Sequence, residues 1–134
     1  MTELERRFVE RWEAAVARRD PGAVTALLAD DVAFYSPAVH RPYEGRELVA
    51  ALLGHVIEVF GELTYTGVYT SADGGVVMQF EATVQGPDRV LRLEGVDVFR
   101  LDGEGLIRDM RVMIRPLNGL QALAQAMAAR LGLA

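Results

Sequence analysis

The stretch Glu94–Pro116, EGVDVFRLDGEGLIRDMRVMIRP, decides the fold. Apolar and polar residues alternate along both of its halves, which is the period of a strand with one buried face. Between the halves, Asp102–Gly105 is a typical hairpin connection because Asp and Gly favour tight turns. The stretch therefore predicts two antiparallel strands, over residues 88–101 and 106–115.

The same two-residue period continues upstream of this stretch. It predicts strands over residues 62–71 and 75–85, and turn-forming residues at 72–75 and 85–88 separate the strands. Strands joined by such short turns pair with their chain neighbours. Together with the two later strands they form a curved antiparallel meander.

Helical periodicity flanks the meander on both sides. A helix is predicted over residues 3–19, a short second helix over 21–29, a short strand over 32–36 and a third helix over 46–60. The Ala-rich tail, with leucines at helical spacing, predicts a last helix over 117–132.

Helices and strands separated along the chain in this way are typical of an α+β domain. We expect one domain over residues 1–134, a conical antiparallel curved sheet whose concave face is covered by the N-terminal helices. Such a cone encloses a hollow, the kind of concavity in which small molecules bind. The helix over 117–132 is expected either as a lid on this hollow or as a subunit interface.

Composition excludes several classes of protein. The chain has 134 residues, a net charge of −5 and no cysteine, so a disulfide framework, a thiolate metal site and a cysteine nucleophile are excluded. All fourteen basic residues are arginine, and the net charge argues against nucleic-acid binding. No apolar run reaches the roughly 18 residues of a membrane span. The N-terminus is acidic where a secretory signal would be basic, so we expect a cytoplasmic protein with no membrane partner.

Asp97 is the most informative single residue. Strand alternation places it on one face of its strand with Leu93 and Phe99, opposite Val96 and Val98. Burying a carboxylate among aliphatic side chains costs several kcal/mol unless it is paired or takes up a proton. Asp97 is therefore either an acid of a functional site or a core residue held by a Trp, Tyr or Arg. A bulge that turns it outward is the remaining alternative.

Several short motifs together resemble the nuclear transport factor 2-like superfamily. They are Ala29–Val32, Tyr43–Arg46, Glu94–Arg100 and Asp102–Ile107, in this order and spacing. The chain is most similar to the SnoaL-like polyketide cyclases and ketosteroid isomerases of that superfamily. The resemblance implies an α+β cone, a homodimer packed through the sheet, and an apolar pocket between sheet and helices.

The resemblance also implies which residues line that pocket. Asp97 is the expected catalytic residue, and the others are expected to bind the substrate: Trp12, Phe34, Ser36, Leu53, Val56, Met78, Phe80, Leu93, Phe99, Met110, Val112 and Ile114. On the strands, these are also the positions that alternation turns inward.

The known chemistries of the family carry over only in part. Ketosteroid isomerases have a base carboxylate where this chain has Ser36, and a tyrosine where it has Trp12; a protonated carboxylic acid matches Asp97. That acid is the ketosteroid isomerase example of pKa tuning. Epoxide hydrolases of the same superfamily have an arginine and a second aspartate where this chain has Gly95 and Val112. Steroid isomerisation and epoxide hydrolysis are therefore both disfavoured, and a SnoaL-like cyclase that uses Asp97 alone is the least contradicted activity.

Three functions remain open at this point. The first is a cyclase or isomerase that acts on a hydrophobic small molecule and uses Asp97 as acid or base. The others are a non-catalytic ligand-binding protein and a dimeric assembly domain. We expect no cofactor and no metal, because His40 and His55 lack a paired ligand set. His40 is interpreted as a solvated loop residue and His55 as a boundary residue of its helix. One of Tyr65 and Tyr69 could reach the hollow.

Overall fold

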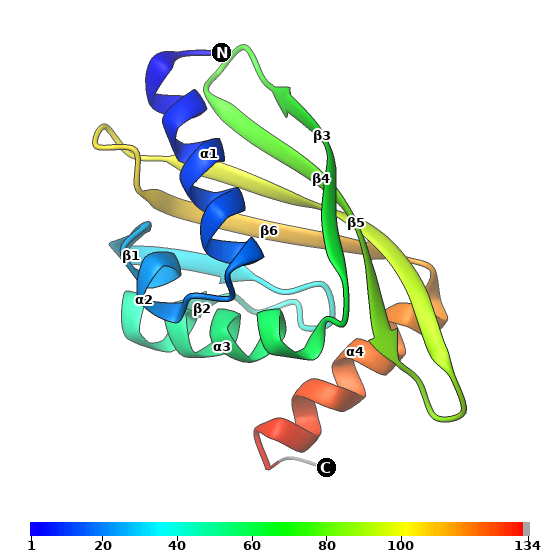
Figure 1. Cartoon of the computed structure of the whole chain (residues 1–134). Helices are drawn as coiled ribbons and strands as arrows, with labels where there is room; N and C mark the ends of the chain where they lie inside the picture. Colours follow the sequence, from blue (N-terminus) through cyan, green and yellow to red (C-terminus); the bar gives the residue numbers. More distant parts are fainter. Residues whose placement is uncertain (133–134) are drawn as a thin grey trace.

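The meander forms the larger part of the sheet. β3 (Leu63–Thr70), β4 (Gly75–Gln85), β5 (Val90–Leu101) and β6 (Ile107–Arg115) pair antiparallel in chain order, as the alternation predicts. The computed structural model describes residues 1–132, so the last two residues of the expected domain lie outside it. Figure 1 shows the long strands curving around α1.

A parallel pairing makes the sheet mixed rather than wholly antiparallel. β1 (Leu28–Tyr35) runs parallel to β6, and the two-residue β2 (Tyr43–Glu44) pairs antiparallel with β1 at the edge. The strand order is β2-β1-β6-β5-β4-β3. A parallel pair needs a long crossover, which no local turn signal reveals; here the crossover includes α3 and the strands after it. The α+β class with a curved sheet is confirmed.

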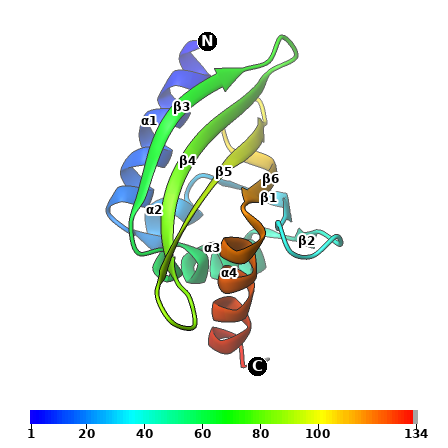
Figure 2. The ribbon, with the colours of Figure 1, turned by 90° about the vertical axis from the view of Figure 1, so that its right-hand side faces the viewer.

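Four helices complete the fold of residues 1–132. They are α1 (Glu3–Ala17), α2 (Pro21–Thr25), α3 (Arg46–Val59) and α4 (Leu117–Arg130). α1 lies across the inner face of the sheet, and α3 and α4 lie side by side at one end of it (Figures 1 and 2). The helices therefore cover the concave face, as the sequence predicts.

The ends of the helices have local causes. α1 begins in a capping box, in which the Thr2 hydroxyl accepts from the Glu5 amide and the Glu5 carboxylate accepts from the Thr2 amide. α2 begins at the Asp20 cap with Pro21 in its first turn. It ends at Thr25, four residues earlier than predicted, because the apolar Leu27 and Leu28 are buried as the chain enters β1.

Two clusters of buried side chains make up the core. One lies between α1, α2, α3 and the sheet and includes Phe8, Trp12 and Phe99. The other lies where α4 packs on β4 and β5 and includes Phe80 and Leu123. A cavity remains beside the two clusters, and residues of both clusters line it.

Candidate ligand-binding and active site

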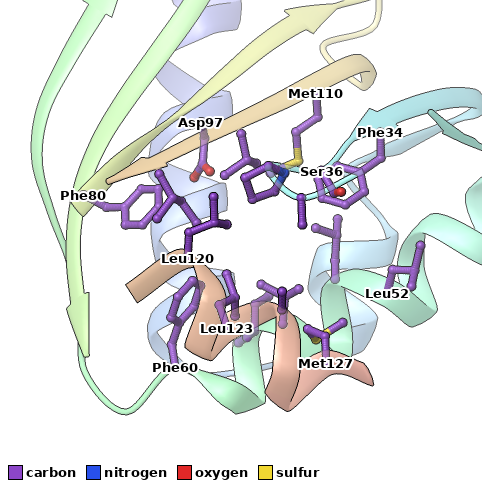
Figure 3. A pocket seen from close by; sticks show the side chains of 18 of the residues that line it. Phe34, Ser36, Leu52, Phe60, Phe80, Asp97, Met110, Leu120, Leu123 and Met127 are labelled. Atoms are coloured by element: carbon purple, nitrogen blue, oxygen red, sulfur yellow. The ribbon is translucent and has the colours of Figure 1, made fainter. Parts of the chain in front are cut away.

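The cavity lies between the inner face of the sheet, α3 and α4. Its volume is about 230 Å³, several times the roughly 30 Å³ that a water molecule occupies in the liquid. In Figure 3, Asp97 and Phe80 lie on one side, Ser36 and Phe34 on another, and side chains of α4 below. Most of the lining is apolar, which suits a hydrophobic guest.

Most of the residues expected in the pocket line this cavity. Those brought together are Trp12, Phe34, Ser36, Leu53, Val56, Phe80, Asp97, Met110, Val112 and Ile114. They come from six elements and the loop after β1, so only the folded chain assembles them. Their roles toward a ligand stay predictions.

Met78, Leu93 and Phe99 do not line the cavity, contrary to expectation. All three point inward, but a neighbouring element covers each of them. The Phe99 ring packs edge-on against Phe8 and Trp12 of α1, with ring centroids 4.9 and 5.1 Å apart. Met78 is buried in the same cluster and Leu93 in the cluster beneath α4. Strand alternation identifies the inner face but not the part of it that the helices fill.

α4 supplies one wall of the cavity, and none of its lining residues was among those predicted from the sequence. Its lining residues are apolar: Leu120, Leu123, Ala124, Met127 and Ala128, followed by Leu131. The helix packs tightly where it starts, because a Cβ at Gly119 would lie 2.9 Å from the Leu93 side chain. The leucines at helical spacing predicted an apolar face, but not which surface it covers.

Asp97 points into the cavity and is also held by the core. Its side chain is only 5% exposed, and the Tyr65 hydroxyl donates a 2.8 Å hydrogen bond to its Oδ2. Oδ1 accepts no hydrogen bond from residues 1–132. In that part of the chain, every fully buried side-chain oxygen or nitrogen has a hydrogen-bond partner, so Oδ1 is not fully buried. Because Asp97 lines the cavity, Oδ1 is open to it. The structure therefore confirms Asp97 as a buried residue held by a tyrosine, and its role as an acid of a functional site stays a prediction.

Burial changes the ionisation of this carboxyl group. Loss of water around it raises the pKa of Asp97 to about 7, while the hydrogen bond from Tyr65 stabilises the carboxylate and opposes that rise. Both forms of Asp97 are thus populated near neutral pH. The group can donate a proton to, or accept one from, a molecule in the cavity.

Tyr65, rather than Tyr69, reaches the cavity. The pairing of β3 with β4 shifts register between Tyr65 and Gly67, so the alternation that linked the two tyrosines breaks there. Tyr69 is 57% exposed, whereas Tyr65 lines the cavity beside Asp97. The Trp12 indole N–H donates to the Tyr65 oxygen at 2.7 Å. Burial and the charge of Asp97 raise the pKa of Tyr65 well above its usual value.

Ser36 does not supply the base carboxylate of ketosteroid isomerases, and Gly95 does not supply the arginine of epoxide hydrolases. Ser36 lines the cavity, and its hydroxyl accepts from the amide of Val39 in the loop that follows. A Cβ at Gly95 would lie 2.3 Å from a backbone oxygen of β6 and 2.9 Å from the ring of Phe80. An arginine at that position has no room, which agrees with the prediction against epoxide hydrolysis.

Neither histidine is among the described residues that line the cavity. His40 is exposed in the loop between β1 and β2. His55 lies on α3, and its Nδ1 accepts a 3.2 Å hydrogen bond from Arg130 of α4. Within residues 1–132, no three His, Cys, Asp or Glu side chains gather into a group that could hold a metal ion. Nor is any helix in this range both long and apolar enough to cross a membrane.

Comparison with known proteins identifies the family. Residues 9–110 match the model of the SnoaL-like domain. The chain belongs to the SnoaL-like family. The matched segment runs from α1 into β6 and contains Asp97, Tyr65 and Trp12. A comparison with curated proteins finds no match for this SnoaL-like protein.

Solved structures similar to this SnoaL-like protein include an isomerase. A steroid delta-isomerase from Pseudomonas aeruginosa is 37% identical, with a TM-score of 0.89 over 98% of this chain and 94% of that one. An uncharacterised protein from Silicibacter pomeroyi with a cystatin-like fold is 36% identical, with a TM-score of 0.85 over 93% and 85%.

A more distant structure holds a steroid. RV0760c from Mycobacterium tuberculosis, solved in complex with estradiol-17beta-hemisuccinate, is 19% identical to this SnoaL-like protein. The TM-score is 0.68 over 86% of this chain and 100% of that one. At this identity the likeness concerns the fold alone.

Proposed function

We propose that this protein binds a neutral, mainly apolar small molecule in the cavity and acts on it as an isomerase or cyclase, with Asp97 as acid or base. The observation that carries the proposal is a buried carboxyl group with one oxygen open to an apolar cavity. Its pKa of about 7 lets it both give and take a proton. The 37% identity with a steroid delta-isomerase from P. aeruginosa supports a rigid polycyclic ligand.

Charge supports a neutral ligand. Among the described lining residues, Asp97 is the one ionic side chain, and none is Arg or His. An anionic group in the cavity would lose its water without gaining a counter-charge, which is costly. The ligand is therefore held mainly by apolar contact with α3, α4 and the sheet.

Ligand binding is tested by filling the cavity from α4. Ala124→Phe adds a ring to the lining, whereas Ala129→Phe adds the same ring on the exposed side of the same helix. Neutral steroids, aromatic polyketide-like compounds and fatty acids are titrated while thermal stability is followed. We expect a neutral polycyclic compound to stabilise the wild type and Ala129→Phe but not Ala124→Phe. Equal stabilisation of the two variants would place binding elsewhere.

Catalysis is tested with an enolisable ketone, 1-tetralone, in D₂O. Asp97 as a base removes a proton next to the carbonyl, and its return as deuterium is counted by NMR. We expect the wild type to exchange this proton faster than buffer and Asp97→Asn to exchange it at the buffer rate. Binding without exchange above the buffer rate would instead support the second candidate, a non-catalytic binding protein. This candidate is favoured by Ser36, which stands where ketosteroid isomerases have a base carboxylate.

We further propose that α4 is a lid. Its distal half meets α3 through Arg130, which pairs with Glu58 and donates to His55. Its first turns are fixed more firmly, because Gly119 and Leu123 are buried against the sheet. Movement of the distal half alone would open the cavity between α3 and α4.

A homodimer through the outer face of the sheet is a separate proposal. Val96 and Val98 of β5 are half-buried on this face, and Met113 of β6 is 54% exposed there. Sedimentation equilibrium is expected to give a dimer for the wild type and a monomer for Met113→Glu. A wild-type monomer at all concentrations would contradict the proposal and would also remove the assembly function.

A further inference from the structure

Three side chains form a hydrogen-bond chain that ends at the cavity. The Trp12 indole of α1 donates to the Tyr65 hydroxyl oxygen of β3 at 2.7 Å, and Tyr65 donates to Oδ2 of Asp97 on β5 at 2.8 Å. Trp12 is at most 2% exposed, and Asp97 is 5% exposed. Oδ1, the other oxygen of Asp97, is the atom that faces the cavity.

The direction of this chain follows from its first member. An indole N–H donates and cannot accept, so the Tyr65 oxygen is the acceptor of that bond. Tyr65 has one hydrogen, and Oδ2 of Asp97 is the partner that it reaches. In the reverse arrangement, Asp97 would donate to Tyr65, and the tyrosine hydrogen would be left unpaired among apolar groups, which is costly.

We propose that Trp12 and Tyr65 are positioning residues that keep Oδ2 of Asp97 an acceptor, so that the Asp97 carboxyl group meets a ligand through a single atom, Oδ1. When Asp97 is neutral, its proton resides on Oδ1 and the carboxyl group presents one donor to the cavity. When Asp97 is ionised, Oδ1 becomes an acceptor. Tyr65 lines the cavity, but its hydrogen is committed to Asp97 and does not serve the ligand.

This arrangement defines the ligand more narrowly than the apolar lining does. Below neutral pH the favoured guest carries one acceptor oxygen, such as a ketone, placed at Oδ1. Above neutral pH the same ketone oxygen faces a carboxylate oxygen, and the preference is lost. This part of the inference rests on the proposed function, because it requires that a ligand enter the cavity.

The series of hydrogen bonds from Trp12 through Tyr65 to Asp97 is tested without a ligand. The carboxyl ¹³C signal of Asp97 is followed against pH in the wild type, Tyr65→Phe and Phe8→Leu. Tyr65→Phe removes a bond that stabilises the carboxylate, so the pKa of Asp97 is expected to rise. Phe8→Leu disturbs the ring that packs on Trp12 and Phe99 but touches no hydrogen bond of the chain, so it controls for packing. An unchanged titration in Tyr65→Phe, or an equal change in both variants, would overturn the inference.

The direction of the chain is tested with two ligands of one shape. The probes are 1-tetralone and 1-methylenetetralin, in which a CH₂ group replaces the carbonyl oxygen. At pH 5.5 the wild type is expected to bind the ketone about three- to tenfold more tightly, which is the worth of one neutral hydrogen bond. At pH 8.5 this preference is expected to vanish.

Asp97→Asn makes the orientation visible. With Trp12 in place, the side-chain carbonyl of the introduced asparagine accepts from Tyr65 and its NH₂ group faces the cavity, so the ketone preference is expected at both pH values. In Asp97→Asn combined with Trp12→Phe, Tyr65 is free to accept, the amide can turn over, and the preference is expected to fall. If Asp97→Asn with Trp12 intact prefers the alkene at both pH values, the hydrogen bond between Tyr65 and residue 97 runs in the reverse direction and the inference is overturned.

The outcomes separate this inference from the proposed function. Binding of both probes with equal affinity at pH 5.5 would overturn the inference and leave a binding cavity. If neither probe binds, the cavity is not a site for such ligands and the proposed function fails for this class. The titration of Asp97 in Tyr65→Phe then still decides whether the hydrogen bonds from Trp12 through Tyr65 act on Asp97.

Discussion

Replacing Asp97 by asparagine is expected to change how stability depends on pH. The pKa of Asp97 is about 7 in the folded protein against an ordinary value of 3.8. Between these values the unfolded chain has released the proton that the folded chain keeps. The wild type therefore loses stability as the pH rises from about 4 to 7 and then levels off. Asp97→Asn keeps the shape of the side chain and has no proton to release.

The size of the effect follows from the same two values. A gap of about three pH units, at about 1.4 kcal/mol each, corresponds to about 4 kcal/mol. We expect Asp97→Asn to gain up to about this amount relative to the wild type between pH 4 and pH 8. Urea unfolding at pH 4, 6 and 8 measures the difference.

A matched control isolates the burial of the charge. Asp88→Asn makes the same chemical change on an exposed turn, so its stability difference from the wild type is expected to stay nearly constant over this range. If the difference for Asp97→Asn is just as constant, Asp97 ionises with its ordinary pKa. The reasoning from burial to acid–base function would then be refuted.

Other expected outcomes concern packing and the lid. Gly95→Ala places a Cβ 2.3 Å from a backbone oxygen of β6 and is expected to destabilise the protein by about 1–3 kcal/mol in thermal unfolding. Gly54→Ala, with open space around its Cβ on α3, is expected to stabilise it by up to about 1 kcal/mol; a loss there would contradict the packing described. Arg130→Ala is expected to speed amide hydrogen exchange in the last turns of α4. Arg100→Ala serves as the control, because it breaks an ion pair of similar exposure at the β3–β4 turn. Equal exchange in α4 of both variants would contradict a role of Arg130 in holding α4 to α3.

Alternation predicted the sheet well because one face of it is buried. Val76 to Val84 on β4 show the pattern at its clearest, and the four strands of the meander lie within two residues of their predicted bounds. The same signal placed Asp97 on the inner face, which the structure confirms. Periodicity depends on neighbours in the chain, and these features are local.

Features that depend on distant segments were not predictable in the same way. The parallel pairing of β1 with β6 brings together residues about 75 apart, such as Phe34 and Met110, and no local pattern encodes it. The register shift between Tyr65 and Gly67 decides which tyrosine faces Asp97, and nothing in β3 marks it. Phe99 was expected in the cavity because alternation cannot tell which inward side chains α1 covers.

The position of α4 along the chain has a consequence for how this architecture diversifies. The family match ends at residue 110, whereas α4 begins at Leu117 and forms one wall of the cavity. Asp97, Tyr65 and Trp12 thus lie inside the matched domain, and the wall of the cavity that α4 forms lies after it, although the likeness to the steroid delta-isomerase extends over 98% of this chain. Under the function proposed above, a different terminal helix on the same cone would change which ligands fit the cavity while leaving Asp97 and its hydrogen bonds in place.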